Sequence, residues 1–146
     1  MKKLLIKNSK KGFTLIELLI VIAIIAILAV LVFVSLDPVQ RFADARNSRR
    51  WSDVNNVLTA VHEYIVDNDG ALPSGLTAGM SSTEVGSCGT CVNLSGPLAP
   101  YLKSMPLDPQ GGSAANTGYS VDVDSNNMVT VYSTAAENAA TIQVSR

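Results

Sequence analysis

One acidic residue stands inside an otherwise apolar run near the start of the chain. The segment 13–36 is built almost entirely of Leu, Ile, Val, Ala and Phe, and Glu17 is its only charged side chain. A carboxylate without a partner is strongly unfavourable in an apolar medium, so an ionisable residue within such a run is a functional candidate by default. Glu17 is therefore the first residue whose chemistry needs an explanation.

Two cysteines, Cys88 and Cys91, form a C-x-x-C motif in the second half of the chain. A zinc site needs about four ligands, and these thiols with the distant His62 do not supply them. A thioredoxin-like redox site needs a βαβ context, which the surrounding sequence lacks. We therefore predict a disulfide that closes a small loop, in a compartment where disulfides persist.

Three further residues, Asp122, Asp124 and Asn126, begin like a calcium-binding loop. Such a loop continues with Gly and ends on a bidentate Glu, whereas this chain has Asn127 and Ser133 at those places. We interpret the three residues as polar positions of a β-hairpin and keep calcium as the alternative. No metal site and no cofactor is predicted.

Nothing in the sequence resembles catalytic machinery. The only histidine, His62, has no Ser or Cys beside it in a nucleophile motif, and the chain has no Gly-rich phosphate loop. No pair of carboxylates stands in a catalytic context. We therefore predict that the protein is not an enzyme.

The segment 13–36 is long enough to cross a membrane. As a helix it would measure about 36 Å, against about 30 Å for the hydrocarbon core of a bilayer. Five lysines precede it within residues 1–12, and lysines on one flank hold that end in the cytoplasm. Without residues 1–12 the chain keeps 6 of its 11 Lys and Arg and all 12 Asp and Glu, so the exported part carries a net charge of −6.

The stretch KKGFTLIELLIV, residues 10–21, resembles the N-terminal signature of type IV prepilins and type II secretion pseudopilins. The resemblance implies that a prepilin peptidase cuts between Gly12 and Phe13 and that Phe13 is then N-methylated. It also implies a helical homopolymer in which Glu17 takes the N-terminal ammonium group of a neighbouring subunit. The implied partners are further copies of the chain, prepilin peptidase, the inner-membrane assembly platform and, before assembly, membrane lipid.

Elementary chemistry agrees with this interpretation. Gly12 has no side chain and holds a helix poorly, so it leaves the backbone open to a protease at the membrane surface. The cut removes the basic leader, and the helix can then leave the bilayer. An ammonium group at Phe13 and the carboxylate of Glu17 lie on one helix face, and the pair could form within one chain or between chains. Without such a partner, Glu17 would lie near the lipid headgroups.

Other interpretations remain open from the sequence. A secretory signal peptide has a shorter apolar region and a small-residue cleavage site, whereas this run is longer and ends at VSLDP, residues 34–38. A plain anchor would make the protein a monomeric, single-pass, membrane-anchored binding module, but it leaves Glu17 without a role. Within the resembling families we predict a structural subunit of a type IV pilus or pilus-like filament, with a major-type pseudopilin of a type II secretion system as the alternative. The expected location is a single-pass membrane protein with a cytoplasmic N-terminus and an exported head, and later an extracellular or periplasmic filament.

A second helical stretch follows the membrane segment. Pro38 should kink or loosen the helix, and apolar residues then recur through 39–66 with a period near 3.6. Residues 39–50 are more polar and suit an exposed stalk, and Gly70 suits the end of the helix. The apolar face, which we expect to pack against the head, comprises Trp51, Val54, Leu58, Val61 and Ile65.

A basic cluster lies within this stalk, at Arg41, Arg46, Arg49 and Arg50. It could contact lipid headgroups, DNA or acidic residues of adjacent subunits. No aromatic side chains alternate with the arginines as a base-stacking platform would require. We predict a solvated stalk or a subunit contact, and nucleic acid is not an expected partner.

The remaining segments predict a small sheet. Residues 71–95 are rich in Gly, Ser and Thr and are predicted to form a loop. Alternating patterns at 119–123 and 128–132, joined by Asn126-Asn127, predict a β-hairpin, and 141–144 could add a third strand. The predicted fold class is therefore α+β and pilin-like, with a long N-terminal α-helix packed on a small antiparallel β-sheet. Its divisions are a leader peptide (1–12), a transmembrane or filament-core helix (13–36), a helical stalk (37–50) and a globular head (51–146).

Overall fold

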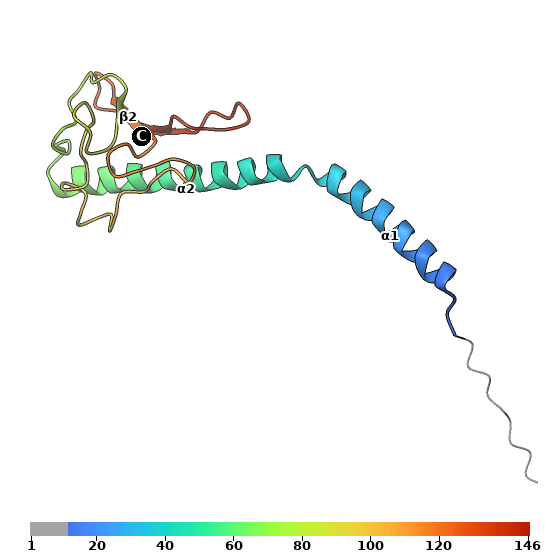
Figure 1. The fold of residues 1–146 in the computed structure, drawn as a ribbon. Coiled ribbons are helices and arrows are strands. Elements are labelled where there is room, and N and C mark those ends of the chain that lie inside the picture. The colour runs from blue at the N-terminus through green and yellow to red at the C-terminus, as the bar shows by residue number, and fades with distance from the viewer. Residues whose placement is uncertain (1–11) are drawn as a thin grey trace, which may run out of the picture. The chain divides into compact units, whose positions relative to one another are not determined.

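The computed structural model describes residues 12–146, so all of the predicted leader except Gly12 lies outside the described residues. The chain divides between Pro38 and Val39 into two compact units. The first contains helix α1 (Leu15–Leu36), and the second contains nearly all of helix α2 (Pro38–Asp67) and a four-stranded sheet (Figure 1). The predicted α+β class, with a helical N-terminal region and a small antiparallel sheet, is confirmed.

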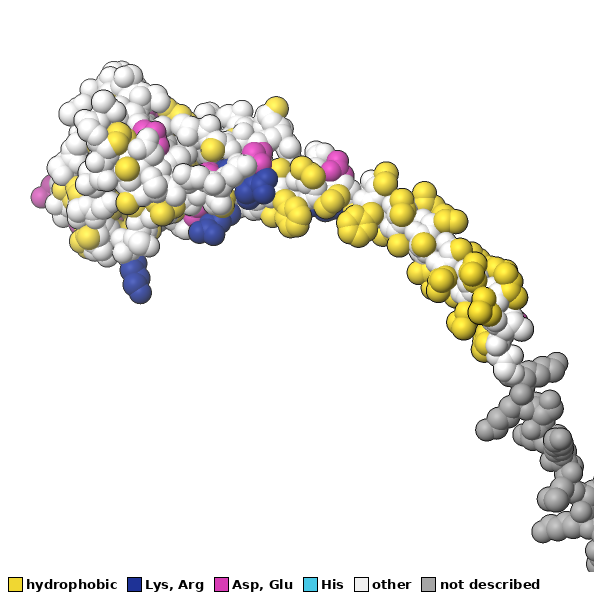
Figure 2. Space-filling model, viewed as in Figure 1, with side chains coloured by type: hydrophobic (Ala, Val, Ile, Leu, Met, Phe, Trp, Pro, Cys, Tyr) yellow, Lys and Arg dark blue, Asp and Glu magenta, His cyan; other side chains and the backbone are white. Residues whose placement is uncertain are grey.

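Helix α1 is apolar on every side. It has 22 residues and no buried side chain, and it begins at Leu15 because Thr14 caps it. Figure 2 shows its apolar side chains uncovered on the visible side. A helix that is hydrophobic all round suits a lipid environment or the interior of a helix bundle. Among the described residues, this is the one helical region that is long and apolar enough to cross a membrane.

The two helices are separated at Asp37. This residue has a left-handed backbone, with φ of 36°, and α2 starts at the next residue, Pro38. Proline tolerates the first position of a helix, where its missing N–H removes no hydrogen bond, and it disfavours helical geometry in the residue before it. The interruption predicted at Pro38 is therefore a helix boundary, placed one residue earlier.

The far end of α2 agrees with the sequence. The helix ends at Asp67, and Gly70 follows with φ of 87°. The N–H of Gly70 donates a hydrogen bond of 2.9 Å to the carbonyl oxygen of Ile65. A glycine in the left-handed region satisfies the last carbonyl groups of a helix, so the predicted role of Gly70 in ending α2 is confirmed.

The sheet has four strands: β1 (Thr83–Glu84), β2 (Tyr119–Val123), β3 (Val129–Ser133) and β4 (Gln143–Ser145). It is antiparallel throughout, with the strand order β1-β2-β3-β4. The predicted hairpin is confirmed as β2 and β3, whose register pairs Tyr119 with Ser133 and Val123 with Val129. The third strand is present as β4, which begins two residues later than the pattern indicates.

Strand β1 corrects the prediction that 71–95 is a loop throughout. Its two residues pair with β2, and Val85 forms a parallel bridge with Val92. The segment also sends Leu76 and Leu94 into the core. Gly, Ser and Thr make up 12 of the 25 residues of this segment, and the apolar residues that make these contacts show no periodicity of their own.

The hydrophobic core lies between α2 and the sheet. Helix α2 contributes Val54, Val57, Leu58 and Val61, and each is at most 2% exposed. The opposing side chains come from the two central strands and are equally buried: Tyr119, Val121, Val123, Val129 and Val131. The period of 3.6 therefore identifies most of the face of α2 that packs against the head.

Trp51 does not belong to this core, contrary to the prediction. Its exposed fraction is 42%, whereas the preceding residue, Arg50, is fully buried. Successive helix residues are about 100° apart, so the face that carries Val54, Val57 and Val61 passes through position 50. Binary patterning assigns an apolar residue to the core in preference to an arginine, and here that preference is wrong.

The exposed stalk predicted for 39–50 is also corrected in part. Val39 and Phe42 are exposed, but Ala43, Asn47 and Arg50 are buried against the head. Asn47 donates from Nδ2 to the carbonyl oxygen of Glu137 at 2.8 Å. The contact between α2 and the head thus begins before residue 51.

Candidate functional site

The first turn of α1 brings Thr14 and Glu17 together. The backbone N–H and the hydroxyl of Thr14 both donate hydrogen bonds to Oε2 of Glu17, each at 2.8 Å. In return, the N–H of Glu17 donates to Thr14 Oγ1 at 3.3 Å. This reciprocal capping box satisfies backbone donors that the start of a helix otherwise leaves unpaired. Glu17 therefore shapes the helix terminus in addition to any role in assembly.

Glu17 keeps the capacity to bind a cation. Within residues 12–146 the hydrogen bonds to its carboxylate all reach Oε2, and no ion pair involves this residue. A carboxylate offers about four lone-pair positions on its two oxygens, so Oε1 can still accept from a charged donor. The start of α1 thus presents one ordered carboxylate with one unused oxygen.

The peptide bond between Gly12 and Phe13 lies outside the helix. Gly12, Phe13 and Thr14 belong to no regular element, and all three are exposed. A Cβ atom placed on Gly12 would meet no heavy atom within 4 Å, and Phe13 is 83% exposed. Exposed, non-helical backbone of this kind is where proteases act, so the exposure of Gly12 and Phe13 would allow a protease to reach this bond.

Two of the four stalk arginines point into the head. Arg50 donates two hydrogen bonds to the carboxylate of Asp108 and one, at 2.7 Å, to Oε2 of Glu137. Arg46 also donates two hydrogen bonds to Glu137. We call these four residues the polar clamp. The prediction of a solvated stalk or a subunit contact is wrong for Arg46 and Arg50, because their acidic partners belong to the same chain.

The polar clamp is ionised at neutral pH. Hydrogen bonds from Arg46 and Arg50 lower the pKa of Glu137 to about 2. Burial alone would raise the pKa of Asp108, but the hydrogen bond from Arg50 and two backbone N–H donors outweigh it, and the pKa is lowered. The bond to Asp108 likewise raises the pKa of Arg50. The clamp therefore joins α2 to two distant loops by charge-assisted hydrogen bonds.

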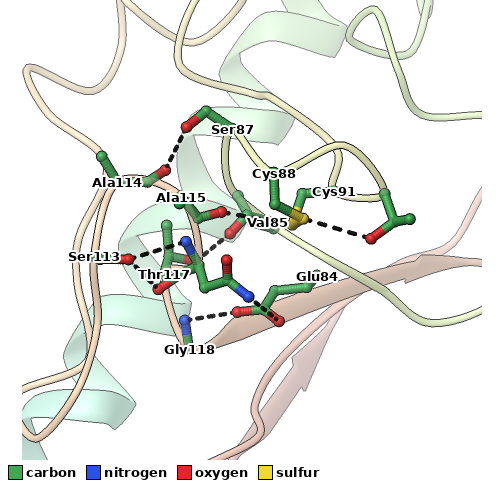
Figure 3. Close-up of a disulfide and its surroundings, with 12 residues drawn as sticks. Glu84, Val85, Ser87, Cys88, Cys91, Ser113, Ala114, Ala115, Thr117 and Gly118 are labelled. Carbon is green, nitrogen blue, oxygen red and sulfur yellow. Dashed lines mark hydrogen bonds between the residues drawn. A yellow bond between two sulfur atoms is a disulfide. The ribbon is translucent and has the colours of Figure 1, made fainter.

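A disulfide joins Cys88 and Cys91, both half-buried. The loop that it closes lies against a second loop: the N–H of Ser87 donates to the carbonyl oxygen of Ala114 at 3.0 Å, and that of Cys88 to Ala115 at 3.1 Å. Figure 3 shows these residues side by side. The disulfide therefore reinforces a contact between two loops near the edge of the sheet that is formed by β1.

The possible calcium ligands serve the β-hairpin turn. Oδ1 of Asp124 accepts hydrogen bonds from the backbone N–H of Asn126 at 2.7 Å and of Met128 at 2.8 Å. Asn127, at the tip, has φ of 64°. Asp124 thus acts as a turn residue, as the polar-hairpin interpretation expects. His62 is half-buried on α2, and within residues 12–146 its Nε2 has no hydrogen-bond partner.

Sequence reasoning missed two features of these sites. The first is Thr14, although Thr14-Leu15-Ile16-Glu17 has the T-x-x-E pattern of a capping box just before an apolar run. The second is the polar clamp, whose carboxylates lie 58 and 87 residues from Arg50. No local signal connects residues so far apart in the chain.

Comparison with known proteins identifies a family signature near the start of the chain. No curated protein and no solved structure matches the chain. Residues 7–33 match the family model described as the prokaryotic N-terminal methylation motif, and this segment contains Gly12, Phe13, Thr14 and Glu17. The chain therefore carries the signature of type IV pilin-like and pseudopilin precursors, which prepilin peptidase generally processes and which self-assemble.

Proposed function

We propose that this protein is a structural subunit of a type IV pilus or pilus-like filament. The observation that carries the proposal is a wholly exposed apolar helix, α1, that begins inside the methylation motif. A helix of this composition needs lipid before assembly and other helices after it. The partners are prepilin peptidase, the membrane assembly platform and further copies of the chain.

Processing is proposed at the bond between Gly12 and Phe13, followed by N-methylation of Phe13. The exposure of both residues and their position before the capped helix support this choice. The cut releases the lysine-rich leader, which fixes the N-terminus on the cytoplasmic side. The mature helix then has no basic anchor and can be withdrawn from the bilayer.

Glu17 is proposed to pair with the new N-terminal ammonium group of a neighbouring subunit. Thr14 orients the carboxylate through Oε2, so Oε1 is available to the incoming cation. In a helix bundle with little water, an unpaired carboxylate is costly and a paired one is tolerated. The pair therefore sets the register of each added subunit more than it adds to filament stability.

Lateral packing of α1 supplies the cohesion of the proposed filament. Moving apolar side chains from lipid into a helix bundle changes the hydrophobic free energy little, so close van der Waals packing must stabilise the bundle. The exposed Leu, Ile and Val side chains of α1 offer that surface. The heads, built on α2, would then cover the outside.

Mass spectrometry of the mature N-terminus tests this proposal. A chain that begins at N-methyl-Phe13 supports it. A chain that retains Met1 supports a monomeric membrane-anchored module, and a chain that begins after about Ser35 supports a cleaved signal peptide. Either of these last two results overturns the filament proposal.

A major-type pseudopilin of a type II secretion system is the second candidate. In some major pilins a disulfide encloses a long C-terminal loop. Here the disulfide joins Cys88 to Cys91 and does not enclose the C-terminal segment. The Pro-Leu-Asp-Pro turn before the hairpin, residues 106–109, also favours this candidate. Neighbouring genes separate the two: a secretion operon indicates the pseudopilus, and a retraction ATPase indicates the pilus.

A further inference from the structure

The head carries one Asn-x-Ser triad, Asn93-Leu94-Ser95. Every other asparagine of the chain lacks a Ser or Thr two positions later. Asn-x-Ser or Asn-x-Thr, with any middle residue except Pro, is the acceptor sequence for N-linked glycans on exported proteins. A triad this short also arises by chance, so its structural setting decides whether it can serve.

Asn93 and Ser95 stand on either side of a buried residue. Both are exposed, whereas Leu94 between them is 0% exposed and belongs to the core of the head. The buried leucine holds this backbone in place. The two polar side chains that a glycosyl-transferring enzyme must reach are thus presented together on one fixed surface turn.

A hydrogen bond within the triad orients the side chain of Asn93. The N–H of Ser95 donates to Oδ1 of Asn93 at 3.1 Å, which closes an Asx turn. Within residues 12–146, neither Nδ2 of Asn93 nor the hydroxyl of Ser95 has a hydrogen-bond partner. A hydrogen bond to the amide oxygen makes the amide protons more acidic, and Asn93 as a residue is exposed.

We propose that Asn93 accepts an N-linked glycan from a lipid-linked sugar phosphate. Nδ2 bonds to the anomeric carbon of the sugar, the bond between that carbon and the phosphate oxygen breaks, and the lipid phosphate leaves with the electron pair. The Nδ2 proton passes to a base of the transferase, which recognises the hydroxyl of Ser95. Nothing is oxidised or reduced. The proposal rests on the proposed function, because the head must be exported to meet such a donor.

The same turn also has a structural role, which the test must separate. Asn93 begins a helical turn in which the N–H of Leu98 donates to the carbonyl oxygen of Leu94 at 3.0 Å. Asp caps such a turn as well as Asn does, so Asn93→Asp keeps the turn and removes the acceptor nitrogen. Ser95→Ala keeps the backbone donor and removes the hydroxyl, whereas Ser95→Thr keeps both.

The experiment is tandem mass spectrometry of the full-length protein from membranes of the cells that make it. Asn93→Asp, Ser95→Ala and Ser95→Thr are produced in the same cells. We expect a glycan on the Asn93 peptide of the wild type and of Ser95→Thr. We expect none in Asn93→Asp and Ser95→Ala, whose melting temperatures stay at the wild-type value.

Three results overturn the proposal. They are a wild-type protein with unmodified Asn93, a glycan that persists in Asn93→Asp or Ser95→Ala, and a glycan that is lost in Ser95→Thr. The same digests contain the N-terminal peptide. An N-terminus other than Phe13 would therefore reveal a failure of the proposed function independently of the state of Asn93.

Discussion

The fully buried guanidinium of Arg50 forms a two-point ion pair with Asp108, which lies 58 residues further along the chain. Arg50 belongs to α2, and Asp108 belongs to the connection between β1 and β2. A fork of two parallel N–H···O bonds fixes both the distance and the plane of the two groups. This pair therefore determines how the loop before the hairpin sits on the helix.

Asp108→Ala should destabilise the head strongly. Asp108→Ala removes both hydrogen bonds to Asp108 from the buried guanidinium of Arg50 and leaves Glu137 as its one ionised partner, and breaking a buried ion pair lowers the free energy of unfolding by up to about 3–5 kcal/mol. Denaturant unfolding of the full chain in detergent, followed by the fluorescence of Trp51, the only tryptophan, measures the loss. Glu63→Ala removes an exposed carboxylate and is the matched control. A loss below about 1 kcal/mol in Asp108→Ala would contradict the role of the pair.

The stability of the head should fall in acid because of Glu137. Its pKa is about 2 in the folded protein, against an ordinary value of 4.5. A depressed pKa in the folded state contributes stability above the unfolded pKa, and that contribution is lost as the pH falls from 4.5 towards 2. Melting temperatures recorded from pH 6 to pH 2 show this loss. Glu137→Gln, which does not titrate, should flatten the decline, and an unchanged profile in that variant would rule out Glu137 as its source.

Glu17→Gln separates the two roles of Glu17. Gln also completes a capping box, so α1 should remain capped, but no charge is left for a neighbour's ammonium group. Cleavage after Gly12 should continue and filaments should be absent, in Glu17→Gln as in Glu17→Ala. Electron microscopy measures the fibre yield and mass spectrometry the processing. Normal fibres from either variant would count against the pairing.

Thr14→Ala tests the cap without removing the carboxylate. Loss of the N-cap hydroxyl lowers helix stability by about 1 kcal/mol, and Glu17 loses one of the two donors that orient it. We expect frayed amides in the first turn of α1, seen as faster hydrogen exchange in detergent, and fewer filaments with processing intact. Thr14→Ser keeps the hydroxyl and should behave as the wild type. Equal hydrogen-exchange rates in Thr14→Ala and Thr14→Ser would show that the Thr14 hydroxyl does not stabilise the first turn of α1.

Leu58→Ala and Trp51→Ala should differ in their effect on stability. Leu58 is 2% exposed, so its truncation leaves a cavity and lowers the free energy of unfolding by about 2–5 kcal/mol. Trp51 is 42% exposed, so its truncation should cost distinctly less. Because Trp51 is the fluorescent probe, circular dichroism follows both unfolding curves. Equal losses of unfolding free energy in the two variants would contradict the assignment of Trp51 to the exposed surface.

The elements that the sequence predicts well are those whose signals are local. Glu17 stands out by its charge in an apolar run, and the hairpin by two alternating segments around Asn126-Asn127. The apolar residues of α2 recur within a single helix, and Gly70 follows the end of that helix. Each pattern depends on residues within a few positions of one another, where backbone geometry fixes which side chains meet.

The errors concern contacts between distant segments. Nothing near Arg50 in the sequence shows that Asp108 and Glu137 will neutralise it, so a buried arginine cannot be told from an exposed one. Trp51 is misplaced for the same reason, since it is the apolar neighbour of a charged residue. Strand β1 has only two residues and exists because β2 is already there to pair with it.

The outermost strands of the sheet are short: β1 has two residues and β4 has three. A strand at the border of a sheet exposes N–H and C=O groups that can hydrogen-bond to another molecule, and brevity limits such backbone pairing. Crowded heads in an array would bring these borders close to one another. In the proposed filament, the few free backbone groups at these borders would disfavour a continuous sheet across neighbouring heads, and contacts between heads would rely on side chains.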